Sequence, residues 1–109
     1  MKIYEIRLTR QAYQNLMDIR DYIQNELLAP EAAKKIVNEL EGAMKSLATM
    51  PARIRLIEEE KWRRKGIRRM VTGNFYIYFL IDEDSEVVKV LAAVAAKRNQ
   101  EAFLSDLEQ

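Results

Sequence analysis

The residues of this chain that could do chemistry are gathered in one short basic run, residues 61–69. Six of these nine residues are cationic: Lys61, Arg63, Arg64, Lys65, Arg68 and Arg69. The whole chain of 109 residues carries a formal net charge of only +1, so this charge is a local patch. A dense cationic patch is typical of a surface that binds phosphate groups or an acidic peptide, although a solvated surface without a ligand is the plainer interpretation.

The composition narrows the chemistry further, because the chain has no histidine and no cysteine. Histidine-based triads, cysteine nucleophiles and ordinary zinc sites are therefore excluded. Catalysis would have to use arginine, lysine, tyrosine and carboxylate side chains, and phosphate is the substrate that suits this set. We predict no metal site and no cofactor. The lack of cysteine fits a cytoplasmic protein, and no apolar run approaches the roughly 20 residues that a membrane span needs.

We expect residues 1–109 to fold as a single domain, whose first half positions the chemistry-bearing second half. Apolar and polar residues alternate over residues 2–8, which predicts an edge strand. Thr9 is placed to cap the helix that follows, whose apolar residues recur every three or four positions. Pro30 suits the first turn of a second helix, which ends before Pro51. Two amphipathic helices joined by a short loop predict an antiparallel hairpin.

The sequence of the second half of the chain predicts a charged connection followed by three strands. The connection covers residues 52–66, and the first strand begins at Ile67. Turns at residues 72–74 and 82–85 separate this strand from two more, the last of which covers residues 87–94. Together these elements predict an α+β fold: an N-terminal strand, an antiparallel helical hairpin and a three-stranded antiparallel meander, with the hairpin covering one face of the sheet.

A second pair of cations, Lys97 and Arg98, directly follows the last predicted strand. If Ile67 opens the meander and its third strand closes just before this pair, we expect both positions to lie at the same end of the sheet. Arg68 and Arg69 would then converge with the second pair. Because four converging cations repel one another, such an arrangement favours an anionic ligand such as RNA, the DNA backbone or an acidic partner segment. The strand pattern leaves open whether Arg68 or Arg69 faces the site.

Aromatic residues accompany the cations and allow two interpretations each. Trp62 could stack on a nucleobase or anchor the basic run to the core. Tyr76 and Tyr78 share one strand face, where nearby cations would lower the pKa of a tyrosine hydroxyl and suit it to proton transfer. Burial of the tyrosine rings is the plainer alternative. The glutamates at positions 58–60 are expected to neutralise part of the basic run.

Several fragments, taken in this order, resemble the RelE/ParE superfamily of toxins from bacterial type II toxin-antitoxin modules. The resemblance covers residue 3 to about residue 100. The fragments are the first helix with its closing Tyr22-Ile23, the second helix from Pro30 to its closing Pro51, the arginine-bearing Gly66-Ile67-Arg68-Arg69, the aromatic strand at residues 74–79 and the ending Lys97-Arg98-Asn99.

The resemblance implies a small toxin that a cognate antitoxin binds and neutralises, with a flexible antitoxin segment covering the basic site. RelE-like members cut messenger RNA on the ribosome, while ParE-like members poison DNA gyrase. In the cutting branch, basic residues and a tyrosine assist attack of the ribose 2′-hydroxyl on the adjacent phosphate. Ribosome-dependent mRNA cleavage, by a metal-independent endoribonuclease, is the favoured prediction. Gyrase inhibition and a non-enzymatic module that binds nucleic acid or an acidic peptide are the alternatives, and a homodimer stays open.

The resemblance also assigns roles to single residues. Arg98 would contact the phosphate or the leaving group, Arg68 would be a second phosphate contact, Lys97 would accept a proton and Tyr76 would assist. The chain departs from the nuclease pattern in three places. It lacks the histidine that many relatives carry before the final arginine, and Phe103 stands where some nucleases have a tyrosine. Tyr76 or Phe75 replaces an arginine that RelE-like members carry on the aromatic strand. The remaining cations are predicted to bind nucleic acid: Lys61, Arg63, Arg64, Lys65 and Arg69.

Overall fold

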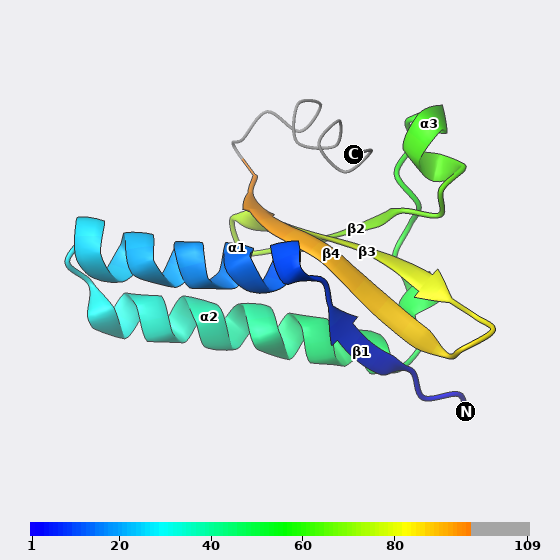
Figure 1. The fold of residues 1–109 in the computed structure, drawn as a ribbon, viewed down its shortest axis with the longest axis horizontal. Helices are drawn as coiled ribbons and strands as arrows, with labels where there is room; N and C mark the ends of the chain where they lie inside the picture. The colour runs from blue at the N-terminus through cyan, green and yellow to red at the C-terminus, as the bar shows by residue number, and fades with distance from the viewer. Residues whose placement is uncertain (97–109) are drawn as a thin grey trace.

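An N-terminal strand leads into two long helices, and three further strands complete the fold (Figure 1). The computed structural model describes residues 1–96. The order and type of the elements confirm the predicted α+β fold, with one short helix added. The elements of this part of the chain are β1 (Glu5–Leu8), α1 (Arg10–Asp21), α2 (Pro30–Lys45), α3 (Glu60–Arg63), β2 (Arg68–Thr72), β3 (Phe75–Asp82) and β4 (Val87–Ala95).

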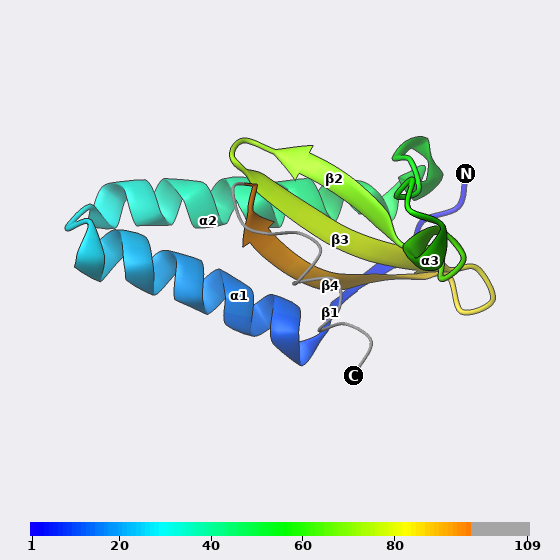
Figure 2. The ribbon, with the colours of Figure 1, turned by 90° about the horizontal axis from the view of Figure 1, so that it is seen from above.

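The four strands form one mixed sheet in the order β1-β4-β3-β2. β1 runs parallel to β4 at one edge, and β3 pairs antiparallel with both β4 and β2. The two long helices lie side by side against one face of this sheet and extend past its end (Figures 1 and 2). The predicted N-terminal edge strand is therefore confirmed, although it begins at Glu5 rather than at Lys2.

Local signals in the sequence account for the ends of the helices. Thr9 caps α1 as predicted, because its Oγ1 accepts a hydrogen bond from the Ala12 amide at 3.1 Å. α1 continues into a π-helical turn, Tyr22–Glu26, and Pro30 begins α2. α2 ends sooner than expected, at Lys45, because the chain tightens there into a 3₁₀ turn. No helix within residues 1–96 has both the length and the apolarity to cross a membrane.

We expect the Thr9→Ala substitution to lower the free energy of unfolding by about 1–2 kcal/mol. The Thr9 hydroxyl also donates to the Leu91 carbonyl on β4 at 3.0 Å, so the substitution removes both the cap and a tie between α1 and the sheet. Urea denaturation followed by circular dichroism measures the change. Thr9→Ser keeps the hydroxyl and should stay within about 0.5 kcal/mol of the parent protein. An equal loss in both variants would contradict the role of the hydroxyl.

The main core lies between the two long helices and the sheet. Side chains on β3 alternate between the two sheet faces, so Ile77 and Phe79 point to the helices while Tyr76 and Tyr78 belong to the opposite face. We call the sheet face turned away from the helices the aromatic face, because it carries the rings of Tyr76 and Tyr78. The buried side chains of the main core are Tyr4, Ala12, Leu16, Leu40, Met44, Leu47, Met70, Ile77, Phe79, Val88, Val90 and Ala93.

The connection between α2 and β2 is not the plain charged loop that was expected for residues 52–66. It contains α3, and Trp62 on this helix packs over the far face of the sheet. Burial of one large aromatic ring holds the charged segment down, since the removal of apolar area from water is favourable. A helix of four residues shows too little periodicity to be predicted from sequence. The resulting second cluster consists of Trp62, Ile67, Tyr78, Ala92 and Val94.

Candidate functional site

The predicted basic run is divided between two elements. Arg68 and Arg69 open β2 and are partly buried. The remaining four cations lie on α3 and in the turn after it, and their side chains are exposed: Lys61, Arg63, Arg64 and Lys65. The basic run is therefore carried partly by α3 with its following turn and partly by the first residues of β2.

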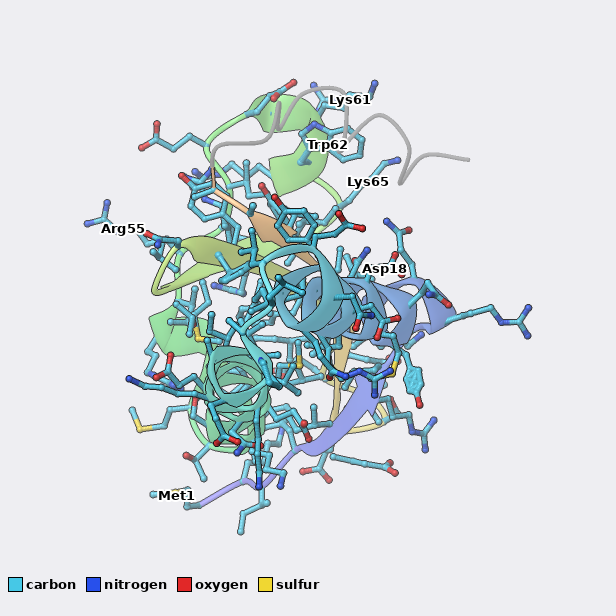
Figure 3. All side chains as sticks on the ribbon, turned by 90° about the vertical axis from the view of Figure 1, so that its left-hand side faces the viewer. Met1, Asp18, Arg55, Lys61, Trp62 and Lys65 are labelled. Atoms are coloured by element: carbon cyan, nitrogen blue, oxygen red, sulfur yellow. The ribbon has the colours of Figure 1, made fainter. Side chains whose placement is uncertain are left out.

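Trp62 holds the cations of α3 against the sheet. Its side chain is 2% exposed, and the Nζ atoms of Lys61 and Lys65 lie 5.1 and 5.2 Å from the centre of its ring system (Figure 3). Contacts of this kind between a cation and an aromatic ring contribute about 0.5–1 kcal/mol each at an exposed site. The interpretation of Trp62 as an anchor is confirmed. A buried ring has no open face for a nucleobase, so the stacking interpretation is wrong.

Arg68 and Arg69 lie on opposite faces of the sheet. Arg68 pairs in register with Phe79 of the main core, and its Nη1 donates to the Ile54 carbonyl at 2.6 Å. Arg69 pairs in register with Tyr78, and its Cζ lies 4.5 Å from the centre of the Tyr76 ring. Arg69 therefore shares the aromatic face with Trp62, whereas the guanidinium of Arg68 secures the connection before β2.

The two cation pairs were expected to converge because the start of the first meander strand and the end of the third were taken to lie at the same end of the sheet. This assumption is wrong. β2 and β4 run in the same direction on either side of β3, so the start of β2 and the end of β4 lie at opposite ends of the sheet. Arg68 and Val90 both pair with Phe79 on β3, so they lie level with each other across the sheet. Val90 is five residues before Ala95, the last residue of β4. Lys97 and Arg98 themselves lie outside the described residues.

The two tyrosines of β3 form an edge-to-face pair on the cationic side of the sheet. Their ring centres are 6.3 Å apart and their planes meet at 72°. Tyr78 is fully buried, and this burial raises the pKa of its hydroxyl, while the charge of Arg69 offsets part of the rise. The expected lowering of a tyrosine pKa by nearby cations is therefore wrong for Tyr78, because desolvation of the ionised form outweighs the attraction of one guanidinium.

The buried Tyr78 hydroxyl predicts a loss of stability at alkaline pH. Because its pKa is raised above 10.0 in the folded state, the unfolded chain loses this proton first as the pH rises. The contribution of Tyr78 to stability is complete below about pH 10 and declines above it. Urea denaturation between neutral and alkaline pH should show this decline, and Tyr78→Phe should make it shallower. Parallel pH profiles for the two proteins would contradict the assignment to Tyr78.

The glutamates before the basic run neutralise it only in part. Glu60 accepts a hydrogen bond from Arg64 Nε at 3.1 Å, one helical turn away, so the predicted neutralising role is confirmed for this residue. An exposed pair of this kind contributes about 0.3–0.5 kcal/mol. Residues 58–69 as a whole keep a net charge of +3. This segment can therefore attract an anion or an acidic peptide.

The described part of the chain offers binding chemistry rather than a metal centre. Within residues 1–96, no three carboxylates gather closely enough to hold a metal ion. A guanidinium stacked on a tyrosine and two ammonium groups on a tryptophan lie on one side of the sheet. Such groups bind anions by charge and planar groups by stacking.

A groove of about 930 Å³, which was not predicted from the sequence, lies between the helical hairpin and the end of the sheet. Its walls include Ile19, Tyr22 and Leu27 on the helical side and Phe75 and Ala96 on the sheet side. Tyr22 and Leu27 are large apolar residues with more than half of their surface exposed. The available signal was a large apolar residue off the buried stripe, Tyr22, close to another just after the helical turn, Leu27.

Comparison with known proteins places the chain in a family. A family model described as the ParE toxin of the type II toxin-antitoxin system parDE matches residues 6–99, which is most of the chain. No curated protein matches the chain significantly.

Solved structures share the fold. A match described as the chromosomal ParDE system of P. aeruginosa has a TM-score of 0.72 and 21% identity, covering 87% of this chain and 98% of that chain. The RelBE2 complex of Mycobacterium tuberculosis follows with a TM-score of 0.62 and 20% identity, covering 89% and 97%. The archaeal RelE-RelB complex of Pyrococcus horikoshii OT3 has a TM-score of 0.59 and 14% identity, covering 89% and 99%. With the family match over residues 6–99, this chain belongs to the ParE toxins of type II toxin-antitoxin systems, within the RelE/ParE superfamily.

Proposed function

We propose that this toxin stops DNA replication by binding DNA gyrase, as ParE-like members of the superfamily do, and that mRNA cleavage is the second candidate. The observation that supports this choice most is the separation of Arg68 from the aromatic face. Its guanidinium is bonded to the Ile54 carbonyl, on the side of the sheet opposite Tyr76. The two residues that the nuclease prediction assigned to catalysis within residues 1–96 therefore do not share a site.

The aromatic face suits protein binding better than proton transfer. Tyr78 cannot serve as a base there, because its hydroxyl is fully buried and its pKa is raised. Among residues 1–96, Tyr76 is then the one residue of the predicted catalytic set on this face. Arginine, tyrosine and tryptophan are the residues on which protein interfaces depend most. The stacked Arg69 and Tyr76 combine the first two in one place.

The second candidate, mRNA cleavage, is favoured by the ending Lys97-Arg98-Asn99, which resembles that of RelE-like members. In that case Arg98 contacts the phosphate or the leaving group and Lys97 accepts a proton. Arg69 then takes the place of Arg68 as the second phosphate contact, because it lies on the aromatic face. Both targets lie in the cytoplasm, which is the location we propose for the toxin.

Brief induced expression in bacteria separates the two candidates. DNA synthesis and protein synthesis are followed by separate labels while mRNA ends are mapped. An early stop in DNA synthesis with intact messages is expected for gyrase inhibition. An early stop in protein synthesis with new cuts inside translated codons would overturn it in favour of the nuclease. Growth inhibition with neither effect would point to the non-enzymatic module.

The cations of α3 are proposed to form part of the surface that the cognate antitoxin covers. Arg63 and Arg64 are exposed there, within a segment of net charge +3. Charge reversal of both, Arg63→Glu with Arg64→Glu, is expected to weaken the antitoxin complex by about 10-fold at low salt and to reduce its salt dependence. Titration calorimetry at two salt concentrations measures both effects.

The matched control reverses two exposed lysines of α2, Lys34→Glu with Lys35→Glu, which changes the net charge equally at a different place. This control should bind the antitoxin within about 3-fold of the parent protein if the α3 surface carries the interaction. Unchanged binding of the α3 variant at low salt would rule out this surface.

A further inference from the structure

We propose that Tyr78 is a positioning residue, whose buried hydroxyl holds the guanidinium of Arg69 over the Tyr76 ring before a partner binds. The proposal rests on the assignment of Arg69 to the functional face, and it adds a residue that is itself buried away from any partner. Since Tyr78 is fully buried, any effect that it has on binding must pass through a neighbouring side chain.

Arg69 has two aromatic neighbours on β3. It stands directly opposite Tyr78 in the register of β2 and β3, and the side chains of such a pair leave the sheet on the same face. The Arg69 Cζ lies 4.5 Å from the centre of the Tyr76 ring, and the rings of Tyr76 and Tyr78 meet edge to face. The guanidinium therefore lies against the ring of Tyr76 and beside Tyr78.

The hydroxyl of Tyr78 interacts with the guanidinium beside it. Burial raises the pKa of this hydroxyl, and the interaction with Arg69 lowers it in part. A guanidinium carries donors and no acceptor, so the tyrosine oxygen is the acceptor in this interaction. The stacked ring fixes the plane of the guanidinium, and the hydroxyl fixes its direction within that plane.

Packing explains the ring of Tyr78 and leaves the hydroxyl to be explained. The ring belongs to the second cluster with Trp62, Ile67 and Val94, where a phenylalanine ring would fill the same space. Taking a hydroxyl out of water is unfavourable unless a polar group compensates for the lost hydration. The hydroxyl at this buried place therefore indicates a role beyond packing, and the guanidinium of Arg69 supplies one.

A guanidinium that is already held favours binding. An arginine side chain has many rotamers, and an interface that immobilises them loses affinity. Where the free toxin already holds Arg69 in place, part of this loss has occurred before the partner arrives. Removal of the Tyr78 hydroxyl should therefore weaken inhibition of the target, although this hydroxyl is buried.

The order of the Arg69 guanidinium tests the positioning without any target. By NMR of the full chain, we expect the Nε–Hε group of Arg69 to show a high heteronuclear NOE and slow proton exchange with water. Tyr78→Phe keeps the ring and should bring both values to those of Arg10, an exposed arginine at the start of α1. Unchanged order and exchange in Tyr78→Phe would overturn the proposal.

The matched control is Tyr4→Phe. It removes a hydroxyl that donates to Glu83, at a tyrosine of the main core on the other side of the sheet. This variant loses one tyrosine hydroxyl, as Tyr78→Phe does, and should leave the Arg69 signals as they are in the parent protein. An equal loss of order at Arg69 in both variants would also overturn the proposal.

A double-mutant cycle tests the link to function. Tyr78→Phe is expected to weaken inhibition by the folded toxin about 5-fold. In the Arg69→Ala background the same substitution should change inhibition less than about 2-fold, since the group that Tyr78 positions is gone. An equal loss in both backgrounds would overturn the proposal. If Arg69→Ala alone left inhibition unchanged, the functional face would be wrongly assigned, and the guanidinium signals would still decide whether Tyr78 holds Arg69.

Discussion

The Trp62→Ala substitution is expected to lower the free energy of unfolding by about 3–4 kcal/mol. The indole is 2% exposed and joins α3 to Ile67, Tyr78, Ala92 and Val94 in the second cluster. Its removal leaves a cavity and also withdraws the ring on which Lys61 and Lys65 rest. Urea denaturation must be followed by circular dichroism, because Trp62 is the single tryptophan and its fluorescence is lost with it.

The Trp62→Phe variant is the matched control. A phenylalanine keeps an aromatic ring over the sheet and removes less volume, so we expect a loss of about 1–2 kcal/mol. A loss below about 1 kcal/mol for Trp62→Ala would contradict the role of the indole as an anchor. In that case α3 would be held by its charged side chains.

The Arg69→Ala substitution is expected to weaken inhibition of the target by about 30-fold while the protein stays folded. Arginines at the centre of an interface typically contribute about 2 kcal/mol or more, which corresponds to this factor. Arg69 lies over the Tyr76 ring on the aromatic face, where a planar guanidinium can meet a partner. The measurement is the toxin concentration that halves gyrase supercoiling, or translation if the nuclease assignment holds, together with the melting temperature.

Arg68→Ala provides the opposite pattern and serves as the control. The Arg68 guanidinium bonds to the Ile54 carbonyl and lies away from the aromatic face. Its loss should lower the free energy of unfolding by about 1.5–3 kcal/mol, as for other hydrogen bonds to charged groups, and change the inhibition by folded protein less than about 3-fold. A larger loss of inhibition in Arg68→Ala than in Arg69→Ala would show that the functional face is assigned to the wrong side.

The order of the elements was predictable because local signals specify each one. Thr9 and Pro30 are side chains whose own chemistry starts a helix, and both stand where helices begin. The turn around Gly73, with φ of 57°, likewise needs no distant contact to be recognised. α3 was missed since a four-residue helix is stabilised by burial of Trp62 and not by its own periodicity.

The candidate site was predicted less well than the fold. The basic run and Tyr76 do lie together on one side of the sheet through Arg69. The expected meeting of the strand ends was wrong for a reason already present in the topology, because the first and third strands of a meander run in the same direction. The groove beside Tyr22 and Leu27 was overlooked because Tyr22 lies off the predicted stripe and Leu27 falls in the loop expected between the two helices.

The sequence by itself determined which chemistry the toxin lacks, which elements it forms and the superfamily that it resembles. These properties follow from residue types and local periodicity, which need no tertiary contact to be recognised. The tertiary structure alone decided which of two adjacent arginines belongs to the aromatic face. Neighbouring strand residues point to opposite faces, so Arg68 and Arg69 could be told apart only once α1 and α2 had covered one side of the sheet and Trp62 the other.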